Sequence, residues 1–188
     1  MSVKLDDKAQ WLTNVRRVAS LNFDDRPQGV EISLLVIHGI SLPPGEFGSS
    51  CIEQLFCNAL DPGAHPYFGE ISELKVSAHL LIDRDGEIIQ FVPFHKRAWH
   101  AGQSEFNGRE NCNDFSIGIE LEGADNVDYE SAQYETLVQV IKELQRAWPQ
   151  LTSENIRGHC HISPGRKTDP GPAFDWDRLD TMLDVFPP

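Results

Sequence analysis

The segment of residues 159–172, with the sequence HCHISPGRKTDPGP, constrains the fold more than any other part of the chain. Its three prolines and two glycines exclude a regular helix or a central strand. Asp169 precedes a proline, which favours extended backbone at that residue. We therefore expect a turning loop that brings His159 and Asp169 close together.

An imidazole and a carboxylate are ligands that suit zinc, and a catalytic zinc site has three protein ligands and one open position. The third ligand that we expect is His38, which follows the apolar run of residues 34–37. His38 and His159 are 121 residues apart (159 − 38), so such a site would form only in the folded chain. Two core or capping histidines and a turn aspartate would give the same pattern, so the residue types alone leave both interpretations open.

Other side chains compete for these roles. In extended backbone, His161 would face the same way as His159 and could replace a ligand, whereas Cys160 would face the opposite way. His79 is a further candidate, although a histidine within a strand more often packs beside a site than ligates a metal. Lys167 could stabilise an oxyanion, or it could be a solvated surface charge.

Residues 115–121 alternate strictly between apolar and small or polar side chains, which predicts a strand. Ser116 and Gly118 share a face with Glu120, and these small residues would leave a depression beside its carboxylate. A carboxylate in such a place, near zinc, can remove a proton from the metal-bound water. An ordinary solvated sheet face explains the same pattern, and the neighbouring Glu122 supports that alternative.

Strands and helices interleave along the chain, without a repeat or a linker, so we expect one domain spanning residues 1–188. The fold class that we expect is mixed α/β, with a central mixed β-sheet flanked by helices. Strands are expected at residues 33–37, 76–82, 87–92 and 115–121, the second and third forming a hairpin. Helices are expected at residues 8–20, from a capping box at residue 50, at 130–148, and from residue 175, with a short helical turn at 152–155.

A formal net charge of −13 argues against nucleic acid or an anionic membrane as a partner. The first residues lack an apolar signal region, and no apolar run approaches transmembrane length. We therefore expect a cytoplasmic protein. Its four cysteines are then expected to be reduced thiols rather than disulfides.

Seven segments carry a resemblance to a known family. They are LLVIH (34–38), ISLPPGEFG (40–48), HPYF (65–68), VSAH (76–79), RAWHAG (97–102), CNDFSIGIELEG (112–123) and RKTDPG (166–171). These segments resemble the AmpD family of zinc-dependent N-acetylmuramoyl-L-alanine amidases, which act on 1,6-anhydro-muramyl peptides in the bacterial cytoplasm. The resemblance covers essentially the whole chain beyond its first residues.

The resemblance implies the mixed sheet and flanking helices that this family shares with peptidoglycan recognition proteins. It implies that His38, His159 and Asp169 are the zinc ligands, and it leaves His161 and Cys160 as neighbours of the site. Two catalytic roles follow from the same resemblance. Glu120 would be the acid/base and Lys167 the residue that stabilises the oxyanion.

The resemblance also places Tyr67 and Trp99 at the substrate groove, and it marks three departures from the family pattern. Lys75 and Asn111 stand where the family uses arginines toward the carboxylates of the peptide. Lysine keeps the charge but not the bidentate fork, and asparagine gives up the charge. Gly39 stands where the family commonly has asparagine. We therefore expect recognition of the third stem residue, diaminopimelate, to be weaker or differently arranged.

The activity implied is hydrolysis of the amide between the muramic lactyl group and L-alanine of anhydro-muropeptides by a monomeric enzyme. It would serve cell-wall recycling and indirectly control β-lactamase induction. One alternative is a broader amidase that cuts polymeric peptidoglycan, and another is a non-catalytic peptidoglycan-binding module. A metalloprotease is disfavoured because no His-Glu-x-x-His motif occurs in the sequence.

Overall fold

A six-stranded mixed sheet forms the centre of the molecule, which we describe from a computed structural model covering residues 3–185. Residues 1–2 and 186–188, which the expected domain includes, lie outside the described part. In sheet order the strands are β1 (Arg16–Arg17), β5 (Ile88–Gln90), β4 (Leu80–Ile82), β9 (Ser116–Glu122), β3 (Leu34–Ile40) and β10 (Ile156–Gly158). The β4–β5 pair is antiparallel and the other pairs are parallel. The predicted fold class is therefore confirmed.

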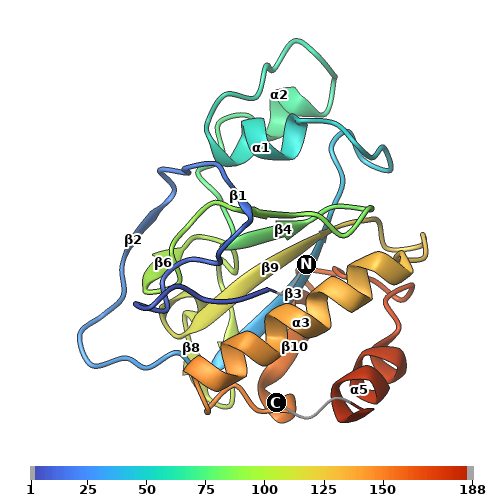
Figure 1. The fold of residues 1–188 in the computed structure, drawn as a ribbon. Helices are drawn as coiled ribbons and strands as arrows, with labels where there is room; N and C mark the ends of the chain where they lie inside the picture. Colours follow the sequence, from blue (N-terminus) through green and yellow to red (C-terminus); the bar gives the residue numbers. More distant parts are fainter. Residues whose placement is uncertain (1–2, 186–188) are drawn as a thin grey trace.

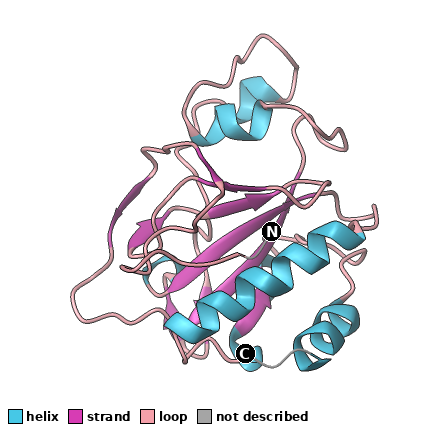
Figure 2. Cartoon of the chain, viewed as in Figure 1, coloured by secondary structure: helices cyan, strands magenta, loops and turns pink. Residues whose placement is uncertain are grey.

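The helices cover the sheet from two sides (Figures 1 and 2). One group consists of α3 (Ser131–Ala147) and α5 (Trp176–Val185), and the other of α1 (Cys51–Phe56) and α2 (Phe68–Ile71). Three short helical elements remain: α4 (His159–Ile162), η1 (Cys112–Asp114) and η2 (Ser153–Asn155). Two further pairs of strands form small two-stranded sheets. The first pairs β2 (Phe23–Asp25) with β6 (Lys96–Ala98), and the second pairs β7 (Glu105–Phe106) with β8 (Arg109–Glu110). No helix within residues 3–185 is both long and apolar enough to cross a bilayer.

Strand alternation divides the core into two sides. Ile117, Ile119 and Leu121 of β9 pack in one apolar cluster with α3 and α5. On the opposite face, Leu81 of β4 packs with α1 and α2, and Val36 of β3 packs with the loop around Ala101. All seven residues of β9 are buried, so a solvated polar face, one of the two interpretations of its alternation, is wrong.

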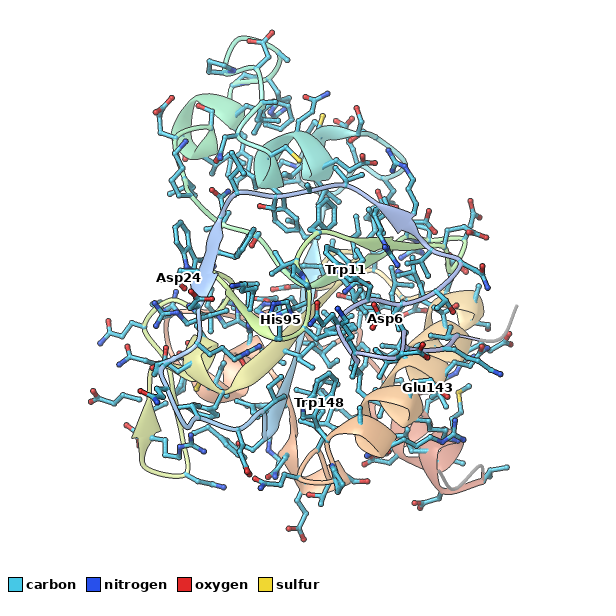
Figure 3. The ribbon with its side chains drawn as sticks, turned by 60° about the vertical axis from the view of Figure 1, so that its left-hand side comes forward. Asp6, Trp11, Asp24, His95, Glu143 and Trp148 are labelled. Atoms are coloured by element: carbon cyan, nitrogen blue, oxygen red, sulfur yellow. The ribbon has the colours of Figure 1, made fainter. Side chains whose placement is uncertain are left out.

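The helix expected at residues 8–20 is absent, and that prediction is wrong. Asp6 folds the segment into a turn, because its Oδ1 accepts the backbone N–H groups of Gln10 at 2.8 Å and Trp11 at 3.3 Å (Figure 3). Ala9 and Asn14 have φ values of 51° and 59°, in the left-handed region that interrupts a helix.

Residues 159–162 form one helical turn, α4, so the exclusion of helix is wrong for these four positions. Two hydrogen bonds close the turn: the Ser163 N–H donates to the His159 carbonyl at 3.0 Å, and the Gly158 N–H donates to His161 Nδ1 at 2.9 Å. From residue 163 to residue 172 the chain forms turns and irregular loop, as the prolines and glycines predict.

The other expected elements are present, with shifted bounds. The hairpin forms with shorter strands, and η2 and α5 lie where helical turns were expected. The capping box expected at Ser50 does not form, since its hydroxyl accepts from Gln54 Nε2 rather than from a backbone N–H. Helix α3 does carry a capping box, in which the Glu130 N–H donates to Gln133 Oε1 at 3.0 Å.

Candidate active site

The parallel register of β3 and β9 fixes the first part of the site, because it pairs His38 with Glu120 at the carboxyl ends of the two strands. Registered residues of neighbouring strands point to the same face of a sheet. The imidazole and the carboxylate therefore lie side by side on the face opposite α3, with His38 Nδ1 4.0 Å from Glu120 Oε1. Both side chains are buried.

Three side chains meet at distances that suit a metal ion. His38 Nδ1 lies 3.0 Å from His159 Nδ1, and both nitrogens lie 3.1 Å from Asp169 Oδ2. A tetrahedral zinc with bonds of about 2.0–2.1 Å holds its ligand atoms roughly 3.3 Å apart. Within residues 3–185, no other group of three or more histidine, cysteine or acidic side chains has a comparable arrangement. The donor set therefore fits zinc.

The loop of residues 100–103 orients the imidazole of His159. His159 Nε2 lies 3.0 Å from the carbonyl oxygen of Ala101, which can only accept. His159 therefore carries its proton on Nε2, and its Nδ1 lone pair faces the other two ligand atoms. The Cys160 N–H donates to the Asp169 carbonyl at 2.9 Å, which ties the aspartate to α4. Arg166 donates to the Ala101 carbonyl at 2.6 Å and thereby attaches the same segment to the loop.

Burial sets the ionisation of the site. Burial raises the pKa of Glu120 well above its ordinary value, and the charge of Asp169 raises it further, while Lys167 opposes the shift. Burial lowers the pKa of His38 to about 4, so this ring is neutral near pH 7 and able to ligate a metal. Burial also disfavours ionisation of Asp169, but the adjoining imidazoles of His159 and His38 outweigh it and hold that pKa below its usual range.

We expect Glu120→Gln to stabilise the metal-free protein at neutral pH. Glu120 Oε2 is buried and has no hydrogen-bond partner within the described residues, so ionisation of this side chain costs stability. Because its folded-state pKa is raised, Glu120 makes its full contribution to the stability of the wild-type protein below about pH 4.5, and this contribution is lost as the pH rises through the folded-state pKa. Denaturant unfolding with chelator at several pH values measures the difference between the two proteins. A difference that shrinks with rising pH would contradict this expectation.

His161 and His79 lie outside the ligand trio. Because α4 is helical, residues two apart point roughly 200° from one another, so the expectation that His161 faces the same way as His159 is wrong. The ring of His161 instead accepts from Gly158 and lies 5.3 Å from Trp176, centroid to centroid. His79 is fully buried, and its Nδ1 accepts the backbone N–H of Gly118 at 3.1 Å.

His100 is a residue of the site that the sequence analysis missed. Its Nδ1 lies 3.0 Å from His38 Nε2, and its Nε2 lies 3.1 Å from Ser116 Oγ. The ring occupies the depression that Ser116 and Gly118 create, since a Cβ on Gly118 would lie 2.5 Å from His100 Cγ. The depression is thus filled from within the chain. The available signal was the position of His100 next to Trp99 in the segment of residues 97–102.

The glycine after His38 has a steric reason in this chain. A Cβ on Gly39 would lie 2.2 Å from the hydroxyl oxygen of Tyr129, and one on Gly123 would lie 2.3 Å from Tyr129 Cε1. The Tyr129 hydroxyl donates to the Pro170 carbonyl at 2.8 Å, next to Asp169. Tyr129 therefore fills the space that a side chain at position 39 would need, and it holds the segment that carries the aspartate.

A cavity of about 530 Å³ opens over the trio. Its polar side includes the trio, Glu120, His100, Lys167, Thr168 and Asp125, and its apolar side comes mainly from Leu42, Pro44, Leu55, Phe56, Tyr67, Ile71, Leu74 and Val76. Tyr67, expected at the substrate groove, and Lys167, expected to stabilise the oxyanion, therefore both line this cavity. A cavity with one charged and one apolar wall can bind a substrate that is partly polar and partly apolar.

The other three predicted substrate-binding residues lie outside this lining. The Trp99 indole N–H donates to Asp24 Oδ1 at 3.1 Å, and Lys75 is exposed. Asn111 lines a separate cavity of about 340 Å³ together with Arg166. These three side chains could meet only parts of a ligand that extend beyond the main cavity.

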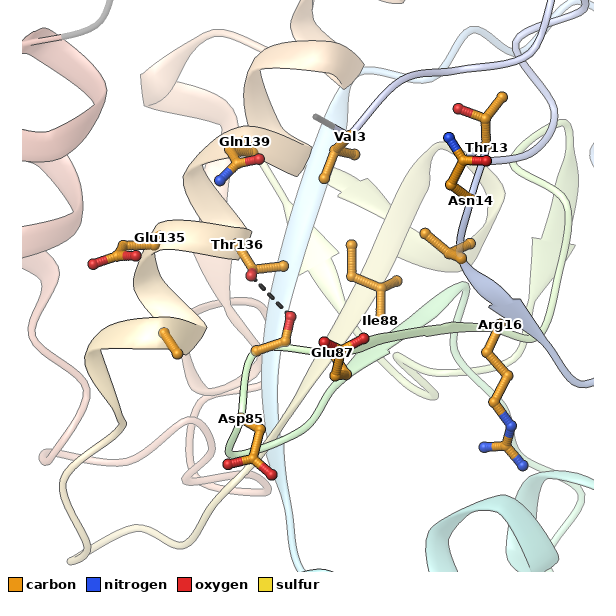
Figure 4. A pocket seen from close by; sticks show the side chains of 13 residues that line it. Val3, Thr13, Asn14, Arg16, Asp85, Glu87, Ile88, Glu135, Thr136 and Gln139 are labelled. Atoms are coloured by element: carbon orange, nitrogen blue, oxygen red, sulfur yellow. Dashed lines mark hydrogen bonds between the residues drawn. The ribbon is translucent and has the colours of Figure 1, made fainter. Parts of the chain in front are cut away.

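A further cavity, of about 500 Å³, lies between α3 and the hairpin of β4 and β5 (Figure 4). Thr136 Oγ1 donates to the Gly86 carbonyl at 2.8 Å across it. Its lining includes Arg16 and the carboxylates of Asp85, Glu87 and Glu135, but none of its lining residues is a histidine or cysteine. This cavity therefore lacks the imidazole ligands that the cavity over the trio offers.

The chain is similar to known amidases over nearly its whole length. The family model described as N-acetylmuramoyl-L-alanine amidase (Amidase_2) matches residues 28–172. The 1,6-anhydro-N-acetylmuramyl-L-alanine amidase AmpD of Salmonella typhimurium (strain SL1344) is 58% identical over 179 residues, which cover 95% of each chain. A crystal structure of a selenomethionine derivative of AmpD matches with a TM-score of 0.91 at 57% identity, covering 95% of this chain and 98% of the other.

A more distant relative has been solved with a ligand. The Escherichia coli N-acetylmuramyl-L-alanine amidase AmiD, in complex with the substrate anhydro-N-acetylmuramic acid-L-Ala-D-gamma-Glu-L-Lys, matches with a TM-score of 0.60 at 26% identity. The match covers 96% of this chain and 65% of that chain. The residues matched by the family model include all three members of the trio, Glu120 and Lys167. The chain therefore belongs to the AmpD family of 1,6-anhydro-N-acetylmuramyl-L-alanine amidases.

Proposed function

We propose that this chain hydrolyses the amide between the muramic lactyl group and L-alanine in 1,6-anhydro-muramyl peptides, with His38, His159 and Asp169 as ligands of a zinc ion. The observation that carries the proposal is the spacing of 3.0–3.1 Å among the three ligand atoms, beside Glu120 and inside an open cavity. The substrate named for the Salmonella relative and the ligand named for AmiD support the substrate class.

A zinc ion, when bound, would polarise the scissile carbonyl and lower the pKa of water in the site. The residues of the chain supply the proton transfers. Glu120 takes the proton of the attacking water as the new carbon–oxygen bond forms, and it returns a proton to the alanine nitrogen as the carbon–nitrogen bond breaks. Its raised pKa suits a group that must both accept and return a proton near neutral pH. The ammonium group of Lys167 stabilises the negative charge that develops on the carbonyl oxygen.

The placement of each residue supports a set of proposed substrate contacts. We propose that Tyr67 contacts the substrate within the cavity, next to the apolar wall that α1 and α2 supply. Lys75, Trp99 and Asn111 are proposed to contact the stem peptide where it extends beyond the cavity. An exposed lysine at position 75 can attract a peptide carboxylate without holding it in a bidentate geometry.

The proposal is tested by incubating the zinc-loaded protein with anhydro-muramyl-tripeptide and identifying the products by mass spectrometry. We expect anhydro-N-acetylmuramic acid and free tripeptide, no products from protein stripped by a chelator, and recovery when zinc is restored. Intact sacculi, assayed in parallel, separate this activity from that of a broader amidase. Binding of the tripeptide without cleavage by the zinc-loaded protein would instead favour a peptidoglycan-binding module.

Substitution of Lys167 by methionine should lower kcat by about 10²–10³-fold, because the oxyanion loses a preorganised cation. Zinc content should stay unchanged, since Lys167 is not one of the proposed ligands. Lys75→Met is the matched control, because it removes the same charge from an exposed position outside the cavity lining. We expect this control to raise KM for the tripeptide with little effect on kcat. Equal kcat values for the two variants would contradict the role of Lys167.

The cellular setting is also a proposal. We propose that residues 1–188 act as one domain and as a monomer, in the cytoplasm, where the reaction would serve cell-wall recycling and indirectly affect β-lactamase induction. Light scattering of the purified protein measures the oligomeric state. Deletion of the gene in its host, followed by assays of muropeptide levels and β-lactamase, tests the proposed roles in cell-wall recycling and in β-lactamase induction.

A further inference from the structure

We propose that His100 is a positioning residue that holds His38 in the tautomer able to ligate the metal, and that one short loop, residues 100–101, orients both imidazole ligands. This inference rests on the proposed zinc site. It concerns a side chain that lines the cavity but belongs neither to the ligand trio nor to the proton-transfer group.

The three side chains Ser116, His100 and His38 form a continuous hydrogen-bonded chain. Ser116 Oγ lies 3.1 Å from His100 Nε2, and His100 Nδ1 lies 3.0 Å from His38 Nε2. The rings of His100 and His38 meet edge to face, with centroids 5.1 Å apart and planes at 88°. Each ring nitrogen of His100 therefore has its own partner.

Hydrogen bonds along this chain can run in either of two directions, and only one is compatible with a metal. If His100 donates from Nδ1, then His38 Nε2 must accept, and the proton of the neutral His38 ring lies on Nδ1, facing Asp169. If His100 carries its proton on Nε2 and donates to Ser116, its Nδ1 accepts from His38 Nε2. The lone pair of His38 Nδ1 is then directed at His159 Nδ1 and Asp169 Oδ2, which lie 3.0 and 3.1 Å away.

The ring of His100 is held in place by its surroundings. On one side the ring packs directly against Gly118. Any larger residue there would collide with it, because a Cβ at position 118 would lie 2.5 Å from His100 Cγ. The ring of His79 lies on another side, 5.9 Å away between centroids, and its Nδ1 accepts the Gly118 N–H. Because packing fixes the side-chain conformation of His100, its Nδ1 already faces His38.

The backbone of the same loop orients the imidazole of His159. Asn113 Oδ1 accepts the N–H of His100 at 3.1 Å and that of Ala101 at 2.8 Å, so a single side-chain oxygen holds both residues. The Ala101 carbonyl then accepts from His159 Nε2 at 3.0 Å. The loop thus supplies one hydrogen-bond acceptor to each imidazole ligand, the His100 ring for His38 and the Ala101 carbonyl for His159. Groups that orient metal ligands in this way typically account for about 10–100-fold in metal affinity.

Two substitutions separate orientation from packing. His100→Leu keeps an apolar group in the depression but removes the acceptor, whereas His100→Asn retains an oxygen at the place of Nδ1. We expect the zinc dissociation constant, measured by competition with a chromogenic chelator, to rise about 10–100-fold for His100→Leu and to stay near the wild-type value for His100→Asn. His79→Leu is the matched control, since it removes a buried imidazole that contacts no ligand but leaves an apolar side chain against the His100 ring, and its zinc affinity should remain near that of the wild type.

Equal weakening of zinc binding in His100→Leu and His100→Asn, or in His100→Leu and His79→Leu, would overturn the proposal in favour of simple packing. Unchanged zinc affinity in His100→Leu would overturn it as well. If that variant does not fold, the unmodified zinc-loaded protein decides the matter by ¹⁵N-correlated NMR of its histidine rings. We expect His100 to be protonated at Nε2, and protonation at Nδ1 would refute the assigned direction. Neither readout uses hydrolysis, so failure of the proposed amidase activity would be seen separately.

Discussion

Replacement of Glu120 by glutamine is expected to lower kcat by about 10²–10⁴-fold while zinc stays bound. The amide keeps the volume of the carboxylate but can neither accept the proton of the attacking water nor return one to the leaving nitrogen. Glu120 lies at the carboxyl end of β9 with Oε1 4.0 Å from His38 Nδ1, beside the trio but outside it. Steady-state kinetics with anhydro-muramyl-tripeptide, together with elemental analysis of the same sample, measures both quantities.

Glu122→Gln is the matched control for this substitution. Glu122 shares a strand face with Glu120 and is also buried, but its carboxylate accepts the N–H groups of Gly48 at 2.6 Å and Arg84 at 3.4 Å. Its replacement should affect the attachment of the loop before α1 rather than turnover. Near-full kcat in Glu120→Gln would show that another group moves the proton. Loss of zinc from that variant would show instead that Glu120 acts as a ligand.

The second large effect is expected at the metal itself. His159→Ala should weaken zinc binding by more than the roughly 100-fold typical of residues that only support a ligand, and turnover should fall with the zinc content. The reason is geometric, because His159 Nδ1 lies within 3.0–3.1 Å of the other two ligand atoms and its Nε2 is already bonded to the Ala101 carbonyl. Chelator competition gives the affinity, and elemental analysis gives the occupancy.

His161→Ala provides the comparison, two residues along the same segment. The ring of His161 accepts from the Gly158 N–H and packs near Trp176, so its removal should cost some stability and leave zinc in place. Full zinc occupancy in His159→Ala with loss in His161→Ala would reverse the assignment. Circular dichroism of both variants shows whether a loss of metal reflects a loss of fold.

Local periodicity was sufficient to predict much of the scaffold. The apolar run that ends at His38, the alternation that leads to Glu120 and the helical stripe of α3 each depend on neighbours in the sequence, and each element forms. The spacing of prolines and glycines likewise predicted the irregular loop that carries Asp169. The residues of the trio came from ligand chemistry, and the resemblance to a family selected them over His161.

Long-range packing explains one feature that the sequence did not reveal, and local hydrogen bonding explains two others. The depression left by Ser116 and Gly118 was foreseeable, but its occupant, His100, arrives from a loop whose position depends on the packing of several strands. The helix expected at residues 8–20 fails because the Asp6 side chain bonds to the backbone of Gln10 and Trp11, a local competition that hydrophobic spacing does not register. The orientation of His161 depends on the single helical turn α4, which the nearby prolines had led us not to expect.

The β3–β9 pairing also has a consequence for the order in which the site is assembled. His38 and Glu120 are brought together by the central strands, whereas His159 and Asp169 follow Glu120 by 39 and 49 residues in the sequence (159 − 120 and 169 − 120). A chain still on the ribosome can therefore complete this strand pair before His159 and Asp169 have emerged. A translation product that stops before residue 159 would thus carry the strand pair but lack two of the three proposed zinc ligands.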